Sequence, residues 1–196
     1  DREVKVSYKP QYLSADSDEL VRDILFRSAE KLFTSTFHKT EIFDALDIRN
    51  LLEKPLSSLS GGELQRLAIA ICLSKDADLY LLDEPSAYLD SKQRMRAGKT
   101  IKRVMEKLGK SALVVDHDVY FIDMISDALM VFEGEPGKKG VALGPYSLHE
   151  GMNRFLKSVD VTFRRDEETK RPRINKPGSY MDRRQREEGE YYYSML

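Results

Sequence analysis

The sequence of 196 residues contains one cysteine, and it has no apolar run near the roughly 20 residues that a membrane span needs. A single cysteine cannot form a disulfide or a cysteine-ligated cluster within the chain. Cys72 lies in the apolar run 69–73, which predicts a buried structural thiol rather than a ligand or a nucleophile. The chain opens on the charged residues Asp1, Arg2 and Glu3 instead of a signal peptide. We therefore expect a soluble, cytoplasmic protein without a membrane partner.

The sequence also lacks a net charge of either sign, because 32 basic residues face 33 acidic ones and leave a formal charge of -1. This balance excludes a global basic field, so a nucleic-acid partner would have to meet a local patch. From Arg164 to Glu188 there is such an excess, with nine basic and six acidic residues interrupted by prolines. Segment 151–196 is therefore predicted to be an extended or short-helical appendage that builds no core and ends in the exposed tyrosines 191–193.

The N-terminal part of the chain combines a short strand with a helical segment. Residues 4–8 alternate between apolar and polar side chains, which predicts a strand that ends near Gln11. Residues 16–50 follow a helical pattern instead, and Asp16 and Glu19 have the spacing of a capping pair. We expect a small helical segment after the strand.

Ser60 and Glu63 predict a second capping box, which opens a helix that runs to about Leu73. The side of this helix that faces the core is predicted to consist of Leu64, Leu67, Ala68 and Ile71. Two interpretations of the turn at Gly61 and Gly62 hold together. Ser60 caps the helix while the glycines make the bend, and the free amides at the same helix start can receive a phosphate.

The next part of the chain has the pattern of a strand, a helix and a second strand. The expected elements are strand 79–82, helix 91–108 closed by Gly109, and strand 112–115. A crossover of this length with a helix inside implies parallel strands, whose carboxyl ends lie at one sheet edge. Ligands of open α/β sheets bind at that edge. Glu84 and His117 follow the two strands and are therefore predicted to come together.

Four residues near this edge carry the chemistry of a nucleotide site. Asp83 and Glu84 end one strand, and in an extended backbone their side chains point opposite ways. Asp83 can then bind Mg²⁺ while Glu84 polarises an attacking water; the alternative is a solvated acidic pair at a loop. His117 follows an apolar run that holds it rigidly, so that it could contact a γ-phosphate. The amide of Gln11 could reach the metal or the water.

Two nearby features have plainer explanations. Asp116 and Asp118, on either side of the histidine, are explained as well by helix capping as by chemistry. Residues 97–100, Ala-Gly-Lys-Thr, look like the end of a phosphate-binding loop. That loop needs a glycine five places before Gly98, where Gln93 stands, and the residues lie inside a predicted helix. We interpret them as helix interior.

Taken in order, these motifs resemble those of ABC-type ATPases over residues 1 to about 150. The matches are Gln11 to the Q-loop, 59–65 to the signature, 79–84 to the Walker B strand, 86–90 to the D-loop and His117 to the switch histidine. The signature wording, the tyrosine in the D-loop and the tail over 163–175 further resemble the soluble twin-cassette E-type family of the RNase L inhibitor and ribosome-recycling ATPases, in its archaeal form. The chain resembles the C-terminal part of the second cassette with its terminal hinge segment.

The resemblance implies an α/β fold. It would be a partial ABC-type nucleotide-binding domain, with a parallel P-loop-type sheet that lacks its phosphate-loop strand, a helical subdomain and a C-terminal hinge extension. The implied divisions are 1–14 for the core strand and Q-loop, 15–59 for the helical subdomain, 60–150 for the signature helix and the Walker B and switch-histidine core, and 151–196 for the hinge segment.

The resemblance also implies roles for the site residues. In this family two cassettes face each other, and each signature closes on the nucleotide that the other cassette holds. The residues that would serve the partner's nucleotide are Ser60, Gly61, Gly62 and Glu63. Asp83 and Gln11 would bind the metal, Glu84, His117 and Gln11 would catalyse hydrolysis, and Asp90 would link the two sites. The implied cofactor is Mg-ATP, with no iron–sulfur cluster in this chain.

The implied partners are the first cassette of the same protein, the small ribosomal subunit with its RNA, and translation termination factors. Basic side chains of the hinge segment would contact ribosomal phosphates or, equally, pair with the cassettes. These residues are Arg164, Arg165, Arg171 and Arg173. The phosphate-binding loop itself is absent from the sequence. We therefore expect the chain alone to hydrolyse no ATP.

Two other classes of protein remain as alternatives. A non-catalytic module that docks on a ribosome or a partner cassette would need no nucleotide. The related cassettes of DNA-repair and chromosome-structuring ATPases also have a Ser-Gly-Gly signature, but they require long coiled-coil heptads, and the sequence has none. A Gly-rich loop ending in Gly-Lys-Thr or Gly-Lys-Ser upstream of Asp1 would support the enzyme.

Overall fold

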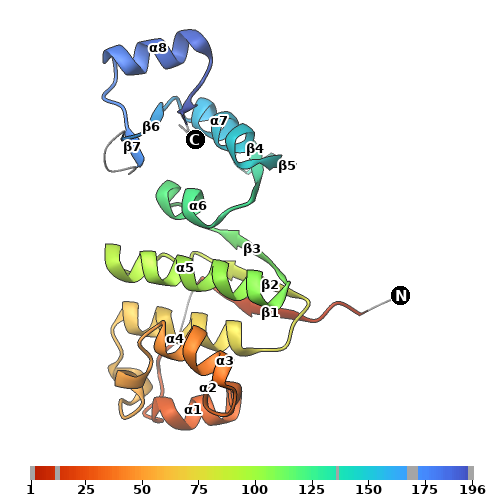
Figure 1. Ribbon diagram of the computed structural model, residues 1–196, viewed down its shortest axis with the longest axis vertical. Coiled ribbons are helices and arrows are strands. Elements are labelled where there is room, and N and C mark those ends of the chain that lie inside the picture. Colours follow the sequence, from red (N-terminus) through yellow and green to blue (C-terminus); the bar gives the residue numbers. More distant parts are fainter. Residues whose placement is uncertain (1–2, 12–13, 136, 167–171, 194–196) are drawn as a thin grey trace. The chain divides into compact units, whose positions relative to one another are not determined.

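The chain forms two compact units, Asp1–Ile125 and Ser126–Leu196, and each is described by itself (Figure 1). The boundary between them falls at Ile125, whereas the sequence pattern places one near residue 150; the functional division of the chain stays a prediction. Among the helices that are described, none combines the length and the apolar character that crossing a bilayer requires. The computed structural model describes residues 3–11, 14–135, 137–166 and 172–193.

The first unit is built on a parallel sheet of three strands in the order β1-β2-β3. The strands are β1 (Val6–Lys9), β2 (Leu79–Asp83) and β3 (Ser111–Val115). Val6 pairs with Leu79, and Leu79 pairs with Ser111, so all three carboxyl ends lie at one edge. The predicted parallel α/β arrangement is confirmed, and the candidate residues that follow each strand are brought to the same edge.

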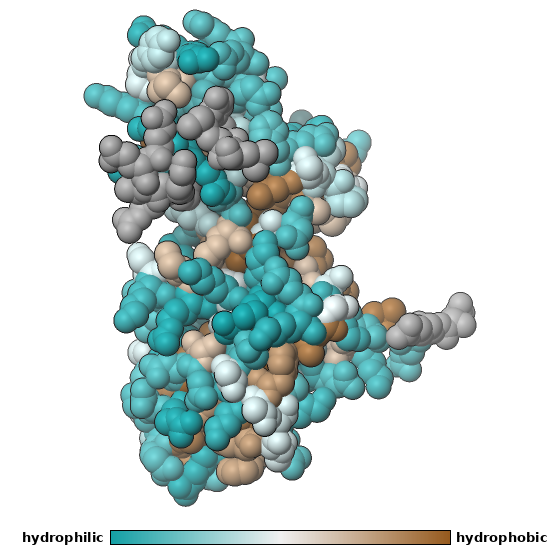
Figure 2. Space-filling view, viewed as in Figure 1, coloured by the Kyte–Doolittle hydropathy of each residue, from teal (hydrophilic) through white to brown (hydrophobic). Residues whose placement is uncertain are grey.

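The two faces of this sheet differ in burial. The covered face carries Ser7, Lys9, Tyr80 and Leu82, all of them buried. The other face leaves Val6, Tyr8, Leu113 and Val115 about half exposed. Figure 2 shows hydrophobic surface next to the N-terminal end of the chain. A parallel sheet normally has both faces covered, so the described residues leave one face of this sheet without its packing layer.

Helices of the first unit pack on the covered face. Helix α4 (Gly61–Ser74) begins with the predicted capping box, and α5 (Ser91–Leu108) is closed by Gly109 in the left-handed conformation. Helix α6 (Val119–Ile125) follows β3 and packs against α5. A Cβ added to Gly98, in the middle of α5, would lie 2.2 Å from the Met124 Cε. The Ala-Gly-Lys-Thr sequence is thus tightly packed helix, as predicted.

The predicted buried side of α4 is only partly right. Leu67 is buried, but the other three predicted residues are only half-buried, and Ile69, Ala70 and Leu73 are buried more deeply. The helix lies between β1 and β2 on one side and the helical segment on another, so more than one stripe is covered. Cys72 is buried and free, and burial raises the pKa of its thiol, which confirms the prediction of an inert structural cysteine.

The helical segment between β1 and α4 consists of short pieces. They are α1 (Val21–Ser28), α2 (Lys31–Thr34), α3 (Thr36–His38), the π-helical turn η1 (Lys39–Asp44) and the 3-10 turns η2 (Arg49–Leu51) and η3 (Leu56–Ser58). The predicted capping pair of Asp16 and Glu19 is wrong, because α1 begins at Val21 without a side-chain cap. The Val21 N–H donates instead to the Lys54 carbonyl at 3.0 Å, so tertiary contact replaces the cap.

The second unit contains a hairpin, a small sheet and two helices. The hairpin strands β4 (Ala128–Glu135) and β5 (Lys139–Ser147) pack against α7 (Leu148–Ser158). The small sheet has the order β7-β6-β8, with β6 (Phe163–Arg165), β7 (Pro172–Ile174) and β8 (Tyr192–Tyr193). Helix α8 (Tyr180–Glu188) lies between β7 and β8 in the chain.

The prediction that the segment after 151 builds no core is wrong. Met152, Leu156 and Phe163 are almost completely buried, and Tyr192 is 1% exposed instead of lying on the surface. The rings of Phe163 and Tyr192 stack with centroids 5.7 Å apart. The prediction was based on the charged stretch 164–188, whereas the apolar residues of this core lie just before and just after that stretch.

Candidate active site

The carboxylate of Glu84, at the end of β2, is the centre of the candidate site. The Gln11 Nε2 donates to the Glu84 Oε1 at 2.8 Å, and the His117 Nε2 lies 2.8 Å from the same oxygen. Gln11 follows β1 and His117 follows β3. The parallel sheet therefore brings together three side chains that lie between 33 and 106 residues apart in the chain. The Glu84 side chain is 20% exposed and the His117 side chain 83%, so the site opens to solvent at the histidine.

The backbone turns sharply at Glu84. Its φ of 46° lies in the left-handed region, which costs a non-glycine residue about 1–2 kcal/mol. The Glu84 N–H donates to the Val115 carbonyl at 2.7 Å, and the Gln65 Nε2 donates to the Glu84 carbonyl at 2.6 Å. The extended backbone assumed for Asp83 and Glu84 therefore ends at Asp83. Hydrogen bonds from neighbouring elements, and not strand alternation, aim the Glu84 carboxylate.

Asp83 belongs to the less covered face of the sheet, with Leu79 and Leu81. Its carboxylate accepts no hydrogen bond from any residue that the structure describes, although Gln11 and Glu84 nearby are paired with each other. An open carboxylate at the end of a strand is available to a hard cation.

Asp116 and Asp118 hold the loop on both sides of His117. Asp116 accepts hydrogen bonds from the Ser86 hydroxyl at 2.7 Å and from the Ser86 N–H at 3.0 Å. Asp118 accepts from the Phe121 N–H at 3.0 Å, which caps α6. Both aspartates are thus engaged in structure, and the histidine between them is the group left facing solvent.

The turn before α4 is a second, separate part of the site. The Ser60 N–H donates to the Glu63 Oε2 at 2.9 Å, and the Glu63 N–H donates to the Ser60 Oγ at 3.4 Å. A Cβ on Gly61 would lie 3.2 Å from the Tyr88 ring, and one on Gly62 would lie 2.9 Å from the Tyr88 carbonyl oxygen. Gly62 is therefore required by the close approach of the Tyr88 backbone to the helix start, whereas a side chain at Gly61 would need the exposed Tyr88 ring to shift slightly.

The loop 86–90 places Tyr88 beside this turn and ends at Asp90, the first residue before α5. Tyr88 has a φ of 61° and is 76% exposed, so a bulky side chain is held outward in an unfavourable backbone conformation. Asp90 accepts a hydrogen bond from the Gln93 N–H at 2.8 Å and caps α5. The predicted link between two nucleotide sites stays a prediction for Asp90.

Comparison with known proteins agrees with this geometry. The ABC transporter family matches residues 1–87. An uncharacterized ABC transporter ATP-binding protein of Methanocaldococcus jannaschii is 53% identical over 97% of this chain and 32% of its own length. The translation initiation factor RLI1 of Saccharomyces cerevisiae is 43% identical over 97% of this chain and 31% of its own length. The chain thus spans about a third of the length of these relatives.

Solved structures show the same relationship. The structure of an RNase-L inhibitor superposes with a TM-score of 0.90 at 55% identity, over 98% of this chain and 38% of the other. A ribosome-bound archaeal ABCE1, in a complex with Pelota, superposes with a TM-score of 0.92 at 53% identity, over 98% and 32%. Residues 1–87 of this chain thus match the ABC transporter family, and 97% of the chain is similar to longer relatives of that kind. Within that family, the relatives are of the E type that the signature and tail resemble.

The ABC-family match allows a fit test for Mg-ATP. Among the residues described, no three His, Cys, Asp or Glu side chains converge to form a metal cage. Mg²⁺ in nucleotide sites uses one or two protein carboxylates together with the phosphates, so such a cage is not needed. The free carboxylate of Asp83 fits that requirement, and the Gln11 amide carbonyl can add a second oxygen.

Two residues of this candidate site were missed by the sequence reasoning. Lys9 is buried beneath the site, and its Nζ lies 2.5 Å from the Asp83 carbonyl oxygen. Gln65, in the signature helix, reaches the Glu84 carbonyl from below. The available signal was a lysine two positions before Gln11 in an alternating strand, on the face opposite to the apolar residues.

The predicted hinge arginines are placed in the second unit. Arg164 and Arg165 lie on β6, where Arg164 is opposite Arg173 of β7. Arg173 forms an ion pair with Asp166 at 3.3 Å and is half exposed. Arg171 lies outside the described residues. Pairing within the unit accounts for part of this basic segment, and contact with a ribosome stays a prediction.

Glu63 provides a test of the signature helix. The Lys54 ammonium, 2.7 Å away, and the Ser60 N–H hold the pKa of Glu63 at about 2. A lowered pKa stabilises the fold above the unfolded value near 4.5, and this contribution shrinks as the pH falls toward 2. We expect Glu63→Ala to destabilise the chain by about 1 kcal/mol at pH 7 and by less at pH 3. Thermal unfolding at both pH values measures this, with Glu53→Ala as the control on an exposed carboxylate. Equal losses at the two pH values would contradict the prediction.

Proposed function

We propose that this chain is part of an ABC-type ATPase that couples ATP binding and hydrolysis to the splitting and recycling of ribosomes. One observation carries the catalytic part of the proposal. The Gln11 amide and the His117 ring converge on one oxygen of Glu84, at the edge of a parallel sheet where nucleotides bind. An acid with two positioned polar neighbours beside an open carboxylate is the arrangement that hydrolysis of a phosphoanhydride needs.

Mg-ATP, when bound, would supply the phosphoryl group, and its Mg²⁺ ion would balance the negative charge of the phosphates. In our proposal Asp83 holds the metal, with help from the Gln11 amide oxygen. The Glu84 carboxylate orients and polarises the attacking water and takes up its proton. His117, exposed at the rim, can turn from Glu84 toward the terminal phosphate and stabilise its charge. Gln11 keeps the Glu84 carboxylate aligned meanwhile.

The half-exposed face of the sheet supports the proposal that other residues complete this cassette. Val6, Tyr8, Leu113 and Val115 form an apolar surface on the same side as Asp83. The relatives are about three times longer than this chain. We infer that a strand and helix bearing the phosphate-binding loop cover this face in the whole protein, and place the phosphates against Asp83.

The signature turn would serve a different nucleotide. Ser60, Gly61 and Gly62 stand at the start of a 14-residue helix, where backbone N–H groups and the helix dipole favour an anion. Tyr88 lies beside this turn, two residues before Asp90, so the signature turn and the D-loop are neighbours in the fold. We propose that these two segments face the first cassette of the same protein and close on the ATP that the first cassette holds.

The ribosomal part of the proposal rests on the relatives. One solved relative is a ribosome recycling factor in complex with the archaeal ribosomal stalk protein, and another is bound to a ribosome with Pelota. We propose the small ribosomal subunit, its RNA and translation termination factors as partners of the whole protein. Arginines of the second unit, such as the half-exposed Arg173, can contact phosphates without regard to sequence.

The experiment compares the full-length protein with the 196-residue chain. We expect the full-length protein to hydrolyse ATP and to separate ribosomal subunits only when ATP is present, because the phosphate-binding loop lies outside this chain. The chain alone should show no hydrolysis above background. Phosphate release and sucrose-gradient sedimentation measure the two activities. ATP-independent subunit separation would identify a docking module instead. Strong turnover by the chain alone, abolished by Glu84→Gln, would contradict the need for another segment.

A further inference from the structure

Strand β1 has its polar and apolar faces reversed relative to an ordinary buried strand. Val6 and Tyr8 are half exposed, whereas Ser7 and Lys9 are each 1% exposed and face the helices. The Ser7 hydroxyl donates to the Cys72 carbonyl at 2.8 Å, and this hydrogen bond compensates for the burial of the hydroxyl. The burial of the Lys9 ammonium is harder to explain, because a charged group loses more hydration than a hydroxyl does. A lysine is almost never fully buried unless it is paired, so its burial requires a partner that repays the loss of water.

The partners of Lys9 are the backbone carbonyls at the end of β2. Its Nζ donates to the backbone carbonyl oxygen of Asp83 at 2.5 Å and lies 3.3 Å from the backbone carbonyl oxygen of Glu84. Burial lowers the pKa of the Lys9 ammonium, and the carboxylates of Asp83, Asp116 and Glu84 oppose this change. The lysine therefore sits beneath the acidic doublet and points its charge at the peptide that joins the two acids.

We propose that Lys9 is a positioning residue for Glu84, holding the peptide after Asp83 so that the Glu84 carboxylate points to Gln11 and His117. This inference rests on the proposed function of the site. Two donors share the work, because the Gln65 Nε2 binds the same Glu84 carbonyl at 2.6 Å. The left-handed φ of Glu84 is unfavourable for an isolated residue and persists only where its surroundings hold it. Lys9 and Gln65 supply the hydrogen bonds that hold it.

A second consequence concerns charge. Asp83 and Glu84 are adjacent, and Asp116 belongs to the next strand end, so the site concentrates negative charge. The buried ammonium balances this charge from the side of the sheet away from Asp83, without blocking the open edge. A neutral side chain of similar size would remove the Lys9 hydrogen bonds to both carbonyls, would leave the Glu84 carbonyl with Gln65 as its side-chain donor, and would leave the two acids without this counter-charge.

The test uses Lys9→Met in the full-length protein, since methionine keeps the length of the side chain and removes its charge. We expect kcat for ATP hydrolysis to fall about tenfold or more, because small misplacements of a catalytic group are costly, while KM for ATP changes by less than about twofold. A crystal structure of the variant should show the hydrogen bond from Gln11 to Glu84 lengthened or lost. Ser7→Ala, on the same face of β1, and Lys110→Met, whose ammonium binds Asp78 at 3.4 Å, are the controls. Both should keep kcat.

A double-mutant comparison separates positioning from general stability. If Lys9 acts through Glu84, adding Lys9→Met to Glu84→Gln should lower kcat no further. A loss of equal size in both backgrounds, or a fall in kcat that matches the unfolded fraction seen by thermal denaturation, would overturn the proposal. Should Lys9→Met not fold, Gln65→Leu removes the second donor to the Glu84 carbonyl, and an unchanged kcat would then overturn it. If Glu84→Gln itself keeps full activity, the proposed function fails rather than the part assigned to Lys9.

Discussion

Glu84→Gln is expected to lower kcat of ATP hydrolysis by the full-length protein about a thousandfold, while ATP still binds. The carboxylate is the basic group at this sheet edge that Gln11 and His117 both contact. Loss of a general base costs about 10²–10⁴-fold in rate. Glutamine keeps the shape of the side chain and cannot take a proton. Because Asp83 and the signature turn are untouched, nucleotide affinity should stay near that of the wild type.

The measurement is steady-state phosphate release together with equilibrium binding of ATP to the same preparations. Glu53→Gln is a matched control, since this glutamate lies on the surface of the same unit and pairs only with Arg22 among the described contacts. It should hydrolyse ATP like the wild type. A Glu84→Gln protein that turns over at the wild-type rate would show that Glu84 is not the catalytic base. Loss of ATP binding would place Glu84 among the binding residues instead.

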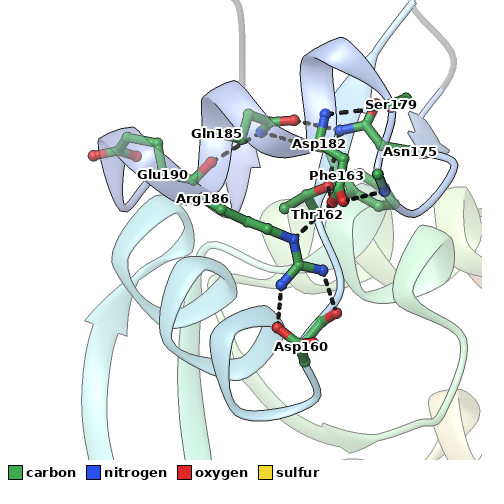
Figure 3. A network of polar contacts seen from close by, with 10 residues as sticks. Asp160, Thr162, Phe163, Asn175, Ser179, Asp182, Gln185, Arg186 and Glu190 are labelled. Carbon is green, nitrogen blue, oxygen red and sulfur yellow. Dashed lines mark hydrogen bonds and ion pairs between the residues drawn. The ribbon is translucent and has the colours of Figure 1, made fainter.

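Asp182→Ala is expected to destabilise the second unit by about 3 kcal/mol, the largest effect on stability that we predict. Asp182 is 3% exposed and lies at the centre of the polar network in Figure 3. The Thr162 hydroxyl donates to its Oδ1 at 2.5 Å, and the Gly178 N–H donates to its Oδ2 at 2.8 Å. The Arg186 Nε also donates to the Oδ1, at 3.0 Å. Removing the carboxylate leaves the buried Thr162 hydroxyl without its acceptor, at a cost of about 1–3 kcal/mol, and also removes the hydrogen bonds from the more exposed Gly178 and Arg186.

The loss should be read from urea denaturation of the chain, followed by circular dichroism. Hydrogen bonds from Thr162 and Gly178 lower the pKa of Asp182, so its contribution is present above its unfolded pKa, about 3.9, and disappears as the pH falls below that value. Asp160→Asn is the control at the exposed end of the same arginine, and it keeps a residue that tolerates the φ of 56°. It should unfold like the wild type. An Asp182→Ala protein as stable as this control would contradict the prediction.

The network continues through two further side chains that the sequence pattern did not single out. The Asn175 amide donates to the Thr162 hydroxyl oxygen at 3.0 Å, and the Gln185 Nε2 donates to the Phe163 carbonyl at 3.1 Å. Both residues are buried. They join the end of β7, the start of β6 and helix α8, as Figure 3 shows. The charged stretch of the second unit is thus organised around a polar core as well as an apolar one.

Local sequence patterns were enough for the elements whose structure depends on near neighbours. The capping box at Ser60 and Glu63 formed as expected, and so did the closure of α5 at Gly109. The two apolar runs before Glu84 and His117 became parallel strands, which brought these side chains to one edge. Hydrophobic periodicity and capping chemistry act over a few residues, so they can be read from the sequence alone.

Contacts between distant segments decided the rest. The start of α1 depends on the Lys54 carbonyl, the turn at Glu84 on Gln65 and Lys9, and the burial of Tyr192 on Phe163. The residues of each pair lie far apart in the sequence, so a periodic pattern of neighbouring residues cannot predict these contacts. Which face of β1 is buried was likewise settled by the carbonyls that Lys9 reaches and by the helices that cover them. The sequence by itself determined the strands that carry the site and the types of residue in it. The tertiary structure decided the orientation of the Glu84 carboxylate. The physical reason is that hydrogen bonds between distant segments outweigh the backbone preference of a single residue.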